Sequence, residues 1–422
     1  MTRLTVSPTS DFLLRDGKPF FYLADTAWAA FANLPIEDWG RYLEARRLQG
    51  FNALQISILP ITHDDSVADS NIAPFLSDQS GNWVFDQYNP EYFDKAVAMI
   101  EAAVEHDFVP VLGVLWANYV PGTRFERKSP VQTAMPLQAV APYATYAAKL
   151  FKPYNPTYFI SGDTHFDVAD EERYYMAALE AVKAVDSDAL LTMHLGPDAK
   201  LPLSLGERID YFMYQSGHHN DRLDRPYTLA DYFTTYPIKR PIVNSEPPYE
   251  GHGRVGTNTR FNAFDVRKAT WQSLLAGAKM GICYGGHGIW SFHRRGMDFL
   301  NKARSFEPYD WDEALTLDGG WDVGFVKWVF ETNGLFDLEP ADIVGGDDPE
   351  IRASMTPDRT KLAVYLPYGF DIDLDIDLTG YDCVQIDLEK RRVTTPKIAV
   401  GARSQVPMLR SNADSLLLAT KR

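Results

Sequence analysis

The sequence predicts an α/β fold, with a (β/α)₈ TIM barrel over residues 1–337 and a small antiparallel β-sandwich domain over residues 338–422. Up to Trp290, eight short apolar runs occur, and segments with helical spacing separate nearly all of them. Such an alternation is typical of a parallel sheet, and eight repeats favour its closure into a barrel. From about Pro340 the helical spacing is lost, and short strand-like runs are separated by Gly, Pro and Asp.

An open, doubly wound sheet is the alternative architecture. A sheet of that kind usually carries a glycine-rich fingerprint directly after its first strand. In this chain the first run ends in Ala24-Asp25-Thr26, without such glycines. The barrel is therefore the favoured prediction.

The eight runs differ in how strongly they predict a strand. Phe108–Leu115 is almost continuously apolar, as expected for a strand that is buried on both faces. The predicted strands are Phe20–Ala24, Phe51–Ile58, Phe108–Leu115, Tyr158–Ser161, Ala189–His194, Tyr211–Gln215, Pro241–Asn244 and one within Gly281–Trp290.

Helical spacing of apolar residues predicts the connecting helices. Asn33 and Pro35 mark the start of the first helix, and Gly281 marks the exit from the last one. The predicted helices are Ile36–Gln49, Glu91–His106, Gln138–Leu150, Glu171–Val185, Tyr227–Thr235 and Phe264–Ala278.

The C-terminal segment contains four further strand candidates. In Asp371–Leu378 aspartate alternates with an apolar residue, which is typical of a half-buried strand. Its four aspartates could bind a cation, but a solvated face that discourages edge-to-edge pairing is the favoured interpretation. The candidates are Leu362–Leu366, Ile372–Leu378, Val384–Leu388 and Ser415–Ala419.

The composition excludes several classes of partner. The net charge of −16 disfavours binding to nucleic acid or to an anionic membrane, whereas a neutral sugar is indifferent to it. No run of 18 apolar residues and no signal peptide is present, so a soluble, cytoplasmic protein is expected. A secreted chain whose signal peptide had been removed would look the same. Cys283 and Cys383 lie in different predicted domains, so no disulfide framework is indicated.

Two carboxylates are the most informative feature of the chain. Asp163 follows the fourth predicted strand and Glu246 follows the seventh. In a closed barrel both would face the mouth at the carboxyl ends of the strands, where such barrels keep their chemistry. Paired carboxylates are what the hydrolysis of a glycosidic bond requires, so we predict Asp163 as acid/base and Glu246 as nucleophile. The alternative is that either one caps a helix or pairs with an arginine.

Other strand ends carry polar and aromatic side chains that suit a sugar pocket, because hydroxyls need hydrogen bonds and ring faces need aromatic platforms. Each of these residues alone is also compatible with a core or loop role. The predicted substrate-binding residues are Asp25, Trp28, His63, Trp116, His194, Gln215, Tyr249, Tyr284, His287 and Trp290.

Two rival functions remain open at this point. A metal-dependent hydrolase could use His63, His194 and His218, although the pair of histidines that such barrels commonly carry after strand one is absent. A barrel that binds carbohydrate without cleaving it is the other rival. Gly285-Gly286-His287-Gly288 lacks the Lys-Ser/Thr of a phosphate cradle, so nucleotide binding is not supported. The favoured prediction involves no cofactor and no metal.

Several segments of the chain resemble the apiosidase-like glycoside hydrolases. This resemblance implies a (β/α)₈ catalytic domain, a C-terminal β-sandwich labelled a collagen-binding domain, and a retaining glycosidase mechanism. It places the acid/base at Asp163 and the nucleophile at Glu246. Ser161 stands where members of the family commonly carry glycine. Characterised members release apiose from plant pectin, a substrate that the resemblance does not assign to this chain. The matching segments are residues 16–21 (DGKPFF), 23–28 (LADTAW), 50–52 (GFN), 160–163 (ISGD), 244–251 (NSEPPYEG) and 284–290 (YGGHGIW).

Overall fold

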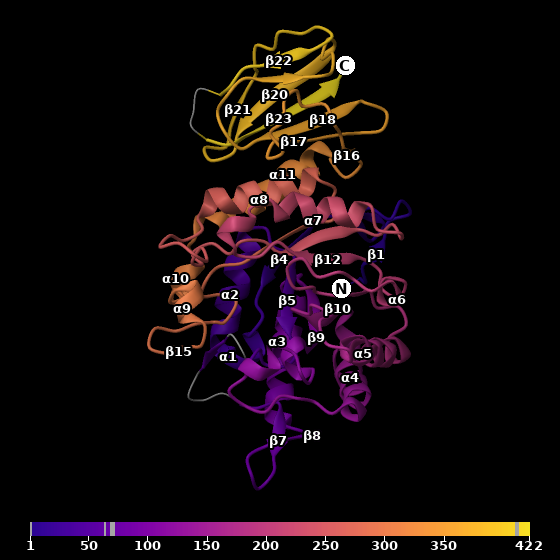
Figure 1. The fold of residues 1–422 in the computed structure, drawn as a ribbon, viewed down its shortest axis with the longest axis vertical. Coiled ribbons are helices and arrows are strands. Elements are labelled where there is room, and N and C mark those ends of the chain that lie inside the picture. The colour runs from indigo at the N-terminus through magenta and orange to yellow at the C-terminus, as the bar shows by residue number, and fades with distance from the viewer. Residues whose placement is uncertain (1, 63–64, 68–71, 410–412) are drawn as a thin grey trace.

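The computed structural model describes residues 2–62, 65–67, 72–409 and 413–422. A large unit of strands and helices occupies most of the chain, and a smaller β-sheet unit is stacked on one end of it (Figure 1). In the described part of the chain, no helix combines the length and the hydrophobicity that crossing a membrane requires.

Eight parallel strands form the sheet of the large unit. They are β4 (Tyr22–Thr26), β5 (Ala53–Ser57), β9 (Val109–Trp116), β10 (Thr157–Gly162), β11 (Leu191–Thr192), β12 (Phe212–Gln215), β13 (Ile242–Glu246) and β14 (Gly281–Tyr284). Their order is β11-β10-β9-β5-β4-β14-β13-β12.

The two end strands of this sheet also meet. His194, just after β11, forms a parallel bridge with Met213 in β12. Beside it, Oγ1 of Thr192 donates a hydrogen bond of 2.6 Å to the carbonyl of Tyr211. The sheet thus closes, through a bridge rather than a full ladder, and the predicted barrel is confirmed.

All eight predicted strands are present, but the fifth and the last are shorter than the runs that predict them. β14 ends at Tyr284 because the chain then crosses the ring of Tyr249. A Cβ atom at Gly285 would lie 2.0 Å from that ring, so only glycine fits here. The segment as far as Trp290 is therefore a loop above the barrel.

All six predicted helices are present within a few residues of the predicted bounds. They are α2 (Ile36–Leu48), α3 (Pro90–Glu105), α4 (Leu137–Phe151), α5 (Glu171–Val185), α7 (Arg225–Thr234) and α8 (Ala263–Leu275). A side-chain cap supports two of them: Asn89 caps α3, and Asn262 forms a capping box with Asp265 at the start of α8.

One long helix, α11 (Asp318–Asn333), has no counterpart among the predictions. Its sequence contains three glycines, which lower the helix propensity of the segment and obscure its helical pattern. Tertiary packing overrides this preference, since α11 contacts α8 and β14.

Shorter elements complete the large unit. They are the helices α1 (Ala30–Asn33), α6 (Leu203–Gly206), α9 (Lys302–Ser305) and α10 (Trp311–Ala314), the 3₁₀ turns η1 (Ala117–Tyr119), η2 (Glu126–Lys128), η3 (Lys152–Tyr154) and η4 (Asn220–Arg222), and the strands β1 (Thr5–Val6), β2 (Leu13–Arg15), β3 (Lys18–Phe20), β6 (Ser66–Val67), β7 (Phe75–Ser77), β8 (Trp83–Tyr88) and β15 (Asp298–Phe299).

The C-terminal unit is built on a six-stranded antiparallel sheet, as predicted for this part of the chain. Its strands are β16 (Glu339–Pro340), β17 (Arg352–Met355), β18 (Lys361–Leu366), β20 (Tyr381–Asp387), β21 (Arg392–Thr394) and β23 (Ser415–Lys421). They lie in the order β16-β17-β18-β23-β20-β21. A separate pair, β19 (Ile372–Leu374) and β22 (Ser404–Val406), packs against one face of it.

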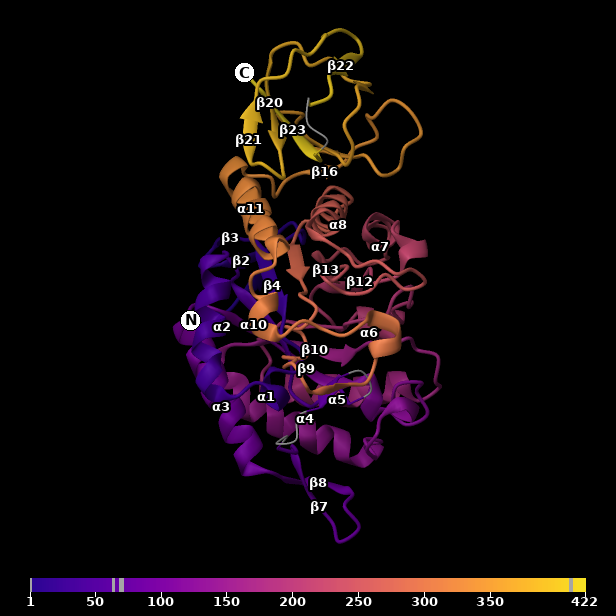
Figure 2. The same cartoon turned by 90° about the vertical axis from the view of Figure 1, so that its left-hand side faces the viewer.

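The two faces of this sheet have different partners. Leu362 and Val364 point into the core that β19 and β22 cover, whereas Ala363 and Tyr365 pack with the barrel. Figure 2 shows the sheet lying directly against α8 and α11. The aspartates of segment 371–377 are exposed, and Ile372 and Leu374 between them are buried, which confirms the alternation, although the strand ends at Leu374 rather than at Leu378.

Buried ion pairs hold the two units together. Arg267 on α8 donates 2.8 Å to Asp414 and 2.7 Å to Asp322, and Tyr365 donates 3.2 Å to Asp414. We call Arg267, Asp322, Tyr365 and Asp414 the junction cluster. It ties α8, α11 and the C-terminal sheet to one another. Cys283 and Cys383 are both free thiols.

Candidate active site

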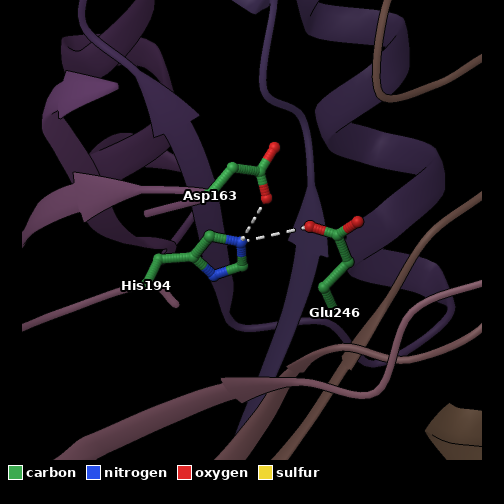
Figure 3. Close-up of side chains that lie close together, drawn as sticks. All are labelled: Asp163, His194 and Glu246. Carbon is green, nitrogen blue, oxygen red and sulfur yellow. Dashed lines mark hydrogen bonds and ion pairs between the residues drawn. The ribbon is translucent and has the colours of Figure 1, made fainter. Parts of the chain in front are cut away.

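The two predicted catalytic carboxylates meet at the carboxyl end of the barrel. Asp163 directly follows β10, Glu246 is the last residue of β13, and His194 follows β11. One ligating atom from each of the three lies within 4.8 Å of the others. Figure 3 shows the imidazole of His194 between the two carboxylates. We call these three residues the catalytic cluster, after the role that the sequence predicts for the two carboxylates.

The backbone around Asp163 presents its carboxylate to the cluster. Asp163 has a φ of 53°, so the chain turns sharply where β10 ends. A Cβ atom at Gly162 would lie 2.2 Å from the indole of Trp116, and glycine at this position lets that ring lie against the strand end. The indole Nε1 of Trp116 then donates to Oδ2 of Asp163 at 3.2 Å.

Glu246 is buried and is held by two histidines. Nε2 of His194 lies 3.1 Å from Oε2 of Glu246, and Nε2 of His218 lies 3.0 Å from Oε1. Burial and the charge of Asp163 both oppose ionisation, but the hydrogen bonds from the histidines prevail and hold the pKa of Glu246 below its usual value. The side chain is therefore an ionised carboxylate at neutral pH, as a nucleophile must be.

His194 is the cationic member of the catalytic cluster. Burial alone would lower its pKa, but its interactions with Asp163 and Glu246 outweigh that effect and raise the pKa to about 9. Its Nε2 lies 3.7 Å from Oδ1 of Asp163. Three aromatic rings surround the imidazole, those of Trp28, Trp116 and Phe159, with centroids 5.3 to 6.0 Å away.

A cavity of about 310 Å³ opens onto the two carboxylates, a size typical of a small-ligand site. Of the predicted substrate-binding residues, five line it together with Asp163 and Glu246: Trp28, Trp116, Gln215, Tyr249 and Trp290. Nε1 of Trp28 donates 2.6 Å to the hydroxyl of Tyr249, which fixes one wall.

Asp25, Tyr284 and His287 do not line this cavity. Asp25 is fully buried and accepts hydrogen bonds of 2.6 Å from both Arg46 and Tyr42, so it supports the barrel wall. Tyr284 donates to Glu250 behind the site. Within the described part of the chain, direct contact with a substrate is therefore not supported for these three residues.

His287 and His63 complete the account of the predicted residues. Nε2 of His287 lies 3.1 Å from the carbonyl of Phe306, and burial lowers the pKa of the imidazole to about 3. His63 lies outside the described residues. The side chain of His194 is fully buried. It contacts the two carboxylates but does not line the cavity.

The structure also places in the pocket residues that the sequence did not predict as substrate-binding; among them, His218 was considered only as a metal ligand. His218, His252 and the pairs Arg124–His165 and Arg304–His219 all line the cavity. The signal that could have found His218 is its position three residues after Gln215, at the end of the sixth strand. The arginines come from long loops, whose course the sequence does not specify.

The long loops help to enclose the site, and the C-terminal unit does not. Ile61, Arg124 and Phe125 belong to the loops after β5 and β9, and all three line the cavity. Within the described residues, no lining residue lies beyond Arg304. The C-terminal sheet is packed on α8 and α11, away from the mouth (Figure 2).

Comparison with known proteins gives one family and a consistent set of folds. The family described as apiosidase-like, catalytic domain, matches residues 7–337. A search of the curated proteins finds no match. A solved structure described as a glycoside hydrolase has a TM-score of 0.83 at 19% identity, covering 100% of this chain and 97% of that one.

Two further structures share the fold. A glycoside hydrolase family 5 protein from Bacteroides vulgatus ATCC 8482 has a TM-score of 0.81 at 20% identity, covering 99% and 93% of the two chains. An endo-1,4-β-mannanase from Rhizomucor miehei has a TM-score of 0.51 at 10% identity, covering 77% and 100%. The family match spans most of the sequence, and its predicted acid/base and nucleophile meet at one cavity. The chain therefore belongs to the apiosidase-like family and is a glycoside hydrolase.

Proposed function

We propose that the protein cleaves a glycosidic bond in a plant-type or bacterial oligosaccharide by a retaining double displacement. In the first step the carboxylate of Glu246 attacks the anomeric carbon, and Asp163 gives its proton to the glycosidic oxygen. The bond between that oxygen and the anomeric carbon breaks, which leaves the sugar as an ester of Glu246. This division of roles follows the chemistry of two opposed carboxylates.

In the second step a water molecule attacks the same carbon. Its proton passes to Asp163, and the bond from the sugar to Glu246 breaks. The carboxylate of Glu246 and the acid form of Asp163 are restored. Two inversions leave the product with the configuration of the substrate.

The observation that carries this proposal is the closeness of the two carboxylates. An oxygen of Asp163 lies within 4.8 Å of one of Glu246. Retaining enzymes hold the two groups about 5–5.5 Å apart, whereas inverting enzymes need about 6.5–9.5 Å to admit a water molecule between them. The lowered pKa of Glu246 supports its assignment as the nucleophile.

The shape of the cavity supports action at the end of a sugar chain. Trp28, Trp116 and Trp290 offer aromatic faces, and Gln215 and His218 offer polar groups. Ile61 and Phe125, from the long loops after β5 and β9, also line the cavity. We therefore propose exo action, in which a terminal sugar occupies the pocket.

The test is a screen of aryl glycosides and pectin oligosaccharides with the wild-type protein and with Glu246→Ala. Turnover should vanish in the variant while saccharide binding persists, and the first product of the wild type, followed by NMR, should keep the anomeric configuration of the substrate. Full activity of Glu246→Ala would remove the nucleophile assignment. An inverted product would overturn the retaining mechanism while leaving the glycosidase itself in place.

A metal-dependent hydrolase is the rival function, because the three atoms of the catalytic cluster are also close enough to surround a cation. In the structure, His194 and His218 both contact Glu246. Metal analysis of the purified protein, with activity measured after chelation, distinguishes the carboxylate mechanism from a metal-dependent hydrolase. Activity that survives complete chelation supports the carboxylate mechanism, and activity restored by one added metal would favour the rival.

A further inference from the structure

The hydrogen bonds around His194 determine how many protons its ring carries. Nδ1 of His194 lies 2.9 Å from Oγ of Ser245. That hydroxyl has a single hydrogen, which it donates to the carbonyl of Tyr214 at 3.0 Å. Ser245 must therefore accept from His194, and Nδ1 carries a proton.

The second nitrogen of the ring is also a donor. Glu246 is an ionised carboxylate and can only accept, so the 3.1 Å contact with Nε2 of His194 requires a proton on Nε2. With both nitrogens protonated, His194 is an imidazolium. The rings of Trp28, Trp116 and Phe159 pack around this imidazolium, with centroids 5.3 to 6.0 Å from that of the imidazole.

His218, the other partner of Glu246, has a different proton count. The backbone N–H of Tyr249 donates to Nδ1 of His218 at 3.2 Å, so Nδ1 carries no proton. Its single ring proton then lies on Nε2 and is donated to Oε1 of Glu246. His218 is a neutral donor, and the two histidines of Glu246 differ in charge while making hydrogen bonds of similar length.

We propose that His194 is a positioning residue that keeps one fixed positive charge between Asp163 and Glu246, and that this charge balances whichever carboxylate is ionised. This inference rests on the proposed double displacement. Nε2 of His194 lies 3.1 Å from Glu246 and 3.7 Å from Asp163, so its positive charge acts on both carboxylates without movement of the ring.

The proposal follows the charge through both steps. Before attack Glu246 is the anion and Asp163 holds the proton. After the first step Glu246 is a neutral ester, and Asp163 has given its proton to the leaving oxygen and become the anion. The negative charge has thus moved from one side of His194 to the other. When water attacks, its proton returns to Asp163, Glu246 leaves as the carboxylate, and the charge moves back.

Few other groups can take over this role. Among the described residues, the titratable side chains that perturb His194 are Asp163 and Glu246. The imidazole of His194 also contacts the hydroxyl of Ser245 and the three aromatic rings. Replacement of His194 by a neutral side chain would leave two carboxylates side by side without a cation.

The first test counts the protons directly in the wild-type protein. Histidine-selective ¹⁵N labelling, with assignment by comparison to His194→Gln, should show two ring N–H groups for His194 at pH 7 and one for His218. A single ring proton on His194 would overturn the inference, whether or not the two carboxylates catalyse the reaction. The outcome of this measurement does not depend on activity.

The second test separates the charge from the hydrogen bond. His194→Gln keeps an N–H donor but removes the charge, and we expect kcat/KM to fall about 100-fold. Without the cation the pKa of Glu246 rises, so the acidic limb of the pH profile of kcat/KM should move up by about 1–3 pH units. A purely structural role would lower the rate and leave this limb in place.

His218→Gln is the matched control, because it exchanges one neutral donor to Glu246 for another. Its rate can fall, but its acidic limb should remain where it is in the wild type. Equal shifts in both variants would overturn the inference. If Glu246→Ala kept full activity, the proposed function would fail instead, and the proton count of His194 would still stand on its own.

Discussion

The molecule contains two buried ionic clusters, and they differ in their cation and in their access to a cavity. In the junction cluster, Arg267 binds Asp322 and Asp414 through several hydrogen bonds. In the catalytic cluster, His194 contacts Asp163 and Glu246, and these two carboxylates line the cavity. Both clusters place one cation between two carboxylates.

The difference shows what makes a buried carboxylate available for chemistry. A guanidinium is charged at every pH that proteins tolerate, and it binds a carboxylate oxygen with a rigid, multi-pronged fork. Arg267 thereby saturates its carboxylates and leaves them no role beyond cohesion. The imidazolium of His194 turns only one nitrogen, Nε2, toward the two carboxylates. The oxygens of Asp163 and Glu246 that face the cavity can therefore reach a sugar.

The largest effect should come from removing a carboxylate of the catalytic cluster while keeping its shape. Glu246→Gln removes the nucleophile, and we expect kcat to fall by about 10⁴-fold or more. The amide has the shape of the carboxylate, so the variant should fold, but it should lose some stability because its NH2 group would face one of the two donating histidines. Steady-state kinetics and thermal unfolding of the same preparation check both parts. A rate within tenfold of the wild type would remove Glu246 from the chemistry.

The second largest effect should come from the junction cluster, with the opposite signature. Arg267→Ala leaves Asp322 and Asp414 buried without their guanidinium, which should cost about 3–5 kcal/mol of unfolding free energy. Because this cluster lies away from the mouth, kcat/KM per folded molecule should stay near the wild-type value. Denaturant unfolding and active-site titration measure the two quantities. A variant that loses activity without losing stability would contradict the distinction between the clusters.

A third prediction concerns the pH dependence of stability, which should report the charge of His194 in the catalytic cluster. His194 has a pKa of about 9 in the folded chain and near 6.5 when unfolded, so its raised value stabilises the fold. This stabilisation is fully present below pH 6.5 and is lost as the pH rises through about 9, and it amounts to at most about 3 kcal/mol. The decline should be absent from the His194→Gln variant. Melting temperatures measured from pH 6 to pH 10 for both proteins provide the comparison.

The smallest effect should come from an ion pair that solvent reaches. Arg403 and Asp375 in the C-terminal unit are 2.5 Å apart, but both side chains are largely exposed. Arg403→Ala should change the unfolding free energy by no more than about 1 kcal/mol. Added calcium should not alter the melting temperature of either protein if the aspartate face is only solvated. A calcium-dependent rise would revive a cation site at these aspartates.

Most of the fold could be predicted because its signals are local. Apolar runs and helical spacing identified all eight barrel strands and six helices. Three of the four predicted C-terminal strands were placed correctly, whereas only Ile372–Leu374 of the predicted strand Ile372–Leu378 is a strand. The helix α11 was not predicted, because its glycines weaken the helical spacing of its apolar residues. Its packing against α8 and β14 stabilises the helix instead. Its stability comes from contacts that are remote in sequence.

The site was harder to predict, because strand-end carboxylates look alike in a sequence. Asp25, Asp163 and Glu246 all lie at barrel strand ends. Asp25 is paired with Arg46, which reaches it from α2, whereas the other two face a cavity. Whether a strand-end carboxylate pairs with an arginine or faces the cavity depends on the direction of its side chain and on the neighbouring helix. The identities of Asp163 and Glu246 as a pair also rested on family resemblance.

The burial of α8 has a practical consequence for anyone who wishes to shorten the chain. Ten consecutive residues, from Val266 to Leu275, are buried, although a barrel's outer helix ordinarily shows one side to water. The sheet formed after Glu339 covers that side. A fragment that stopped at residue 337, where the family match ends, would expose that side and would lack Asp414, so Arg267 would keep only Asp322 as an ionic partner. We expect such a fragment to aggregate, so the smallest soluble enzyme extends well past its recognisable homology.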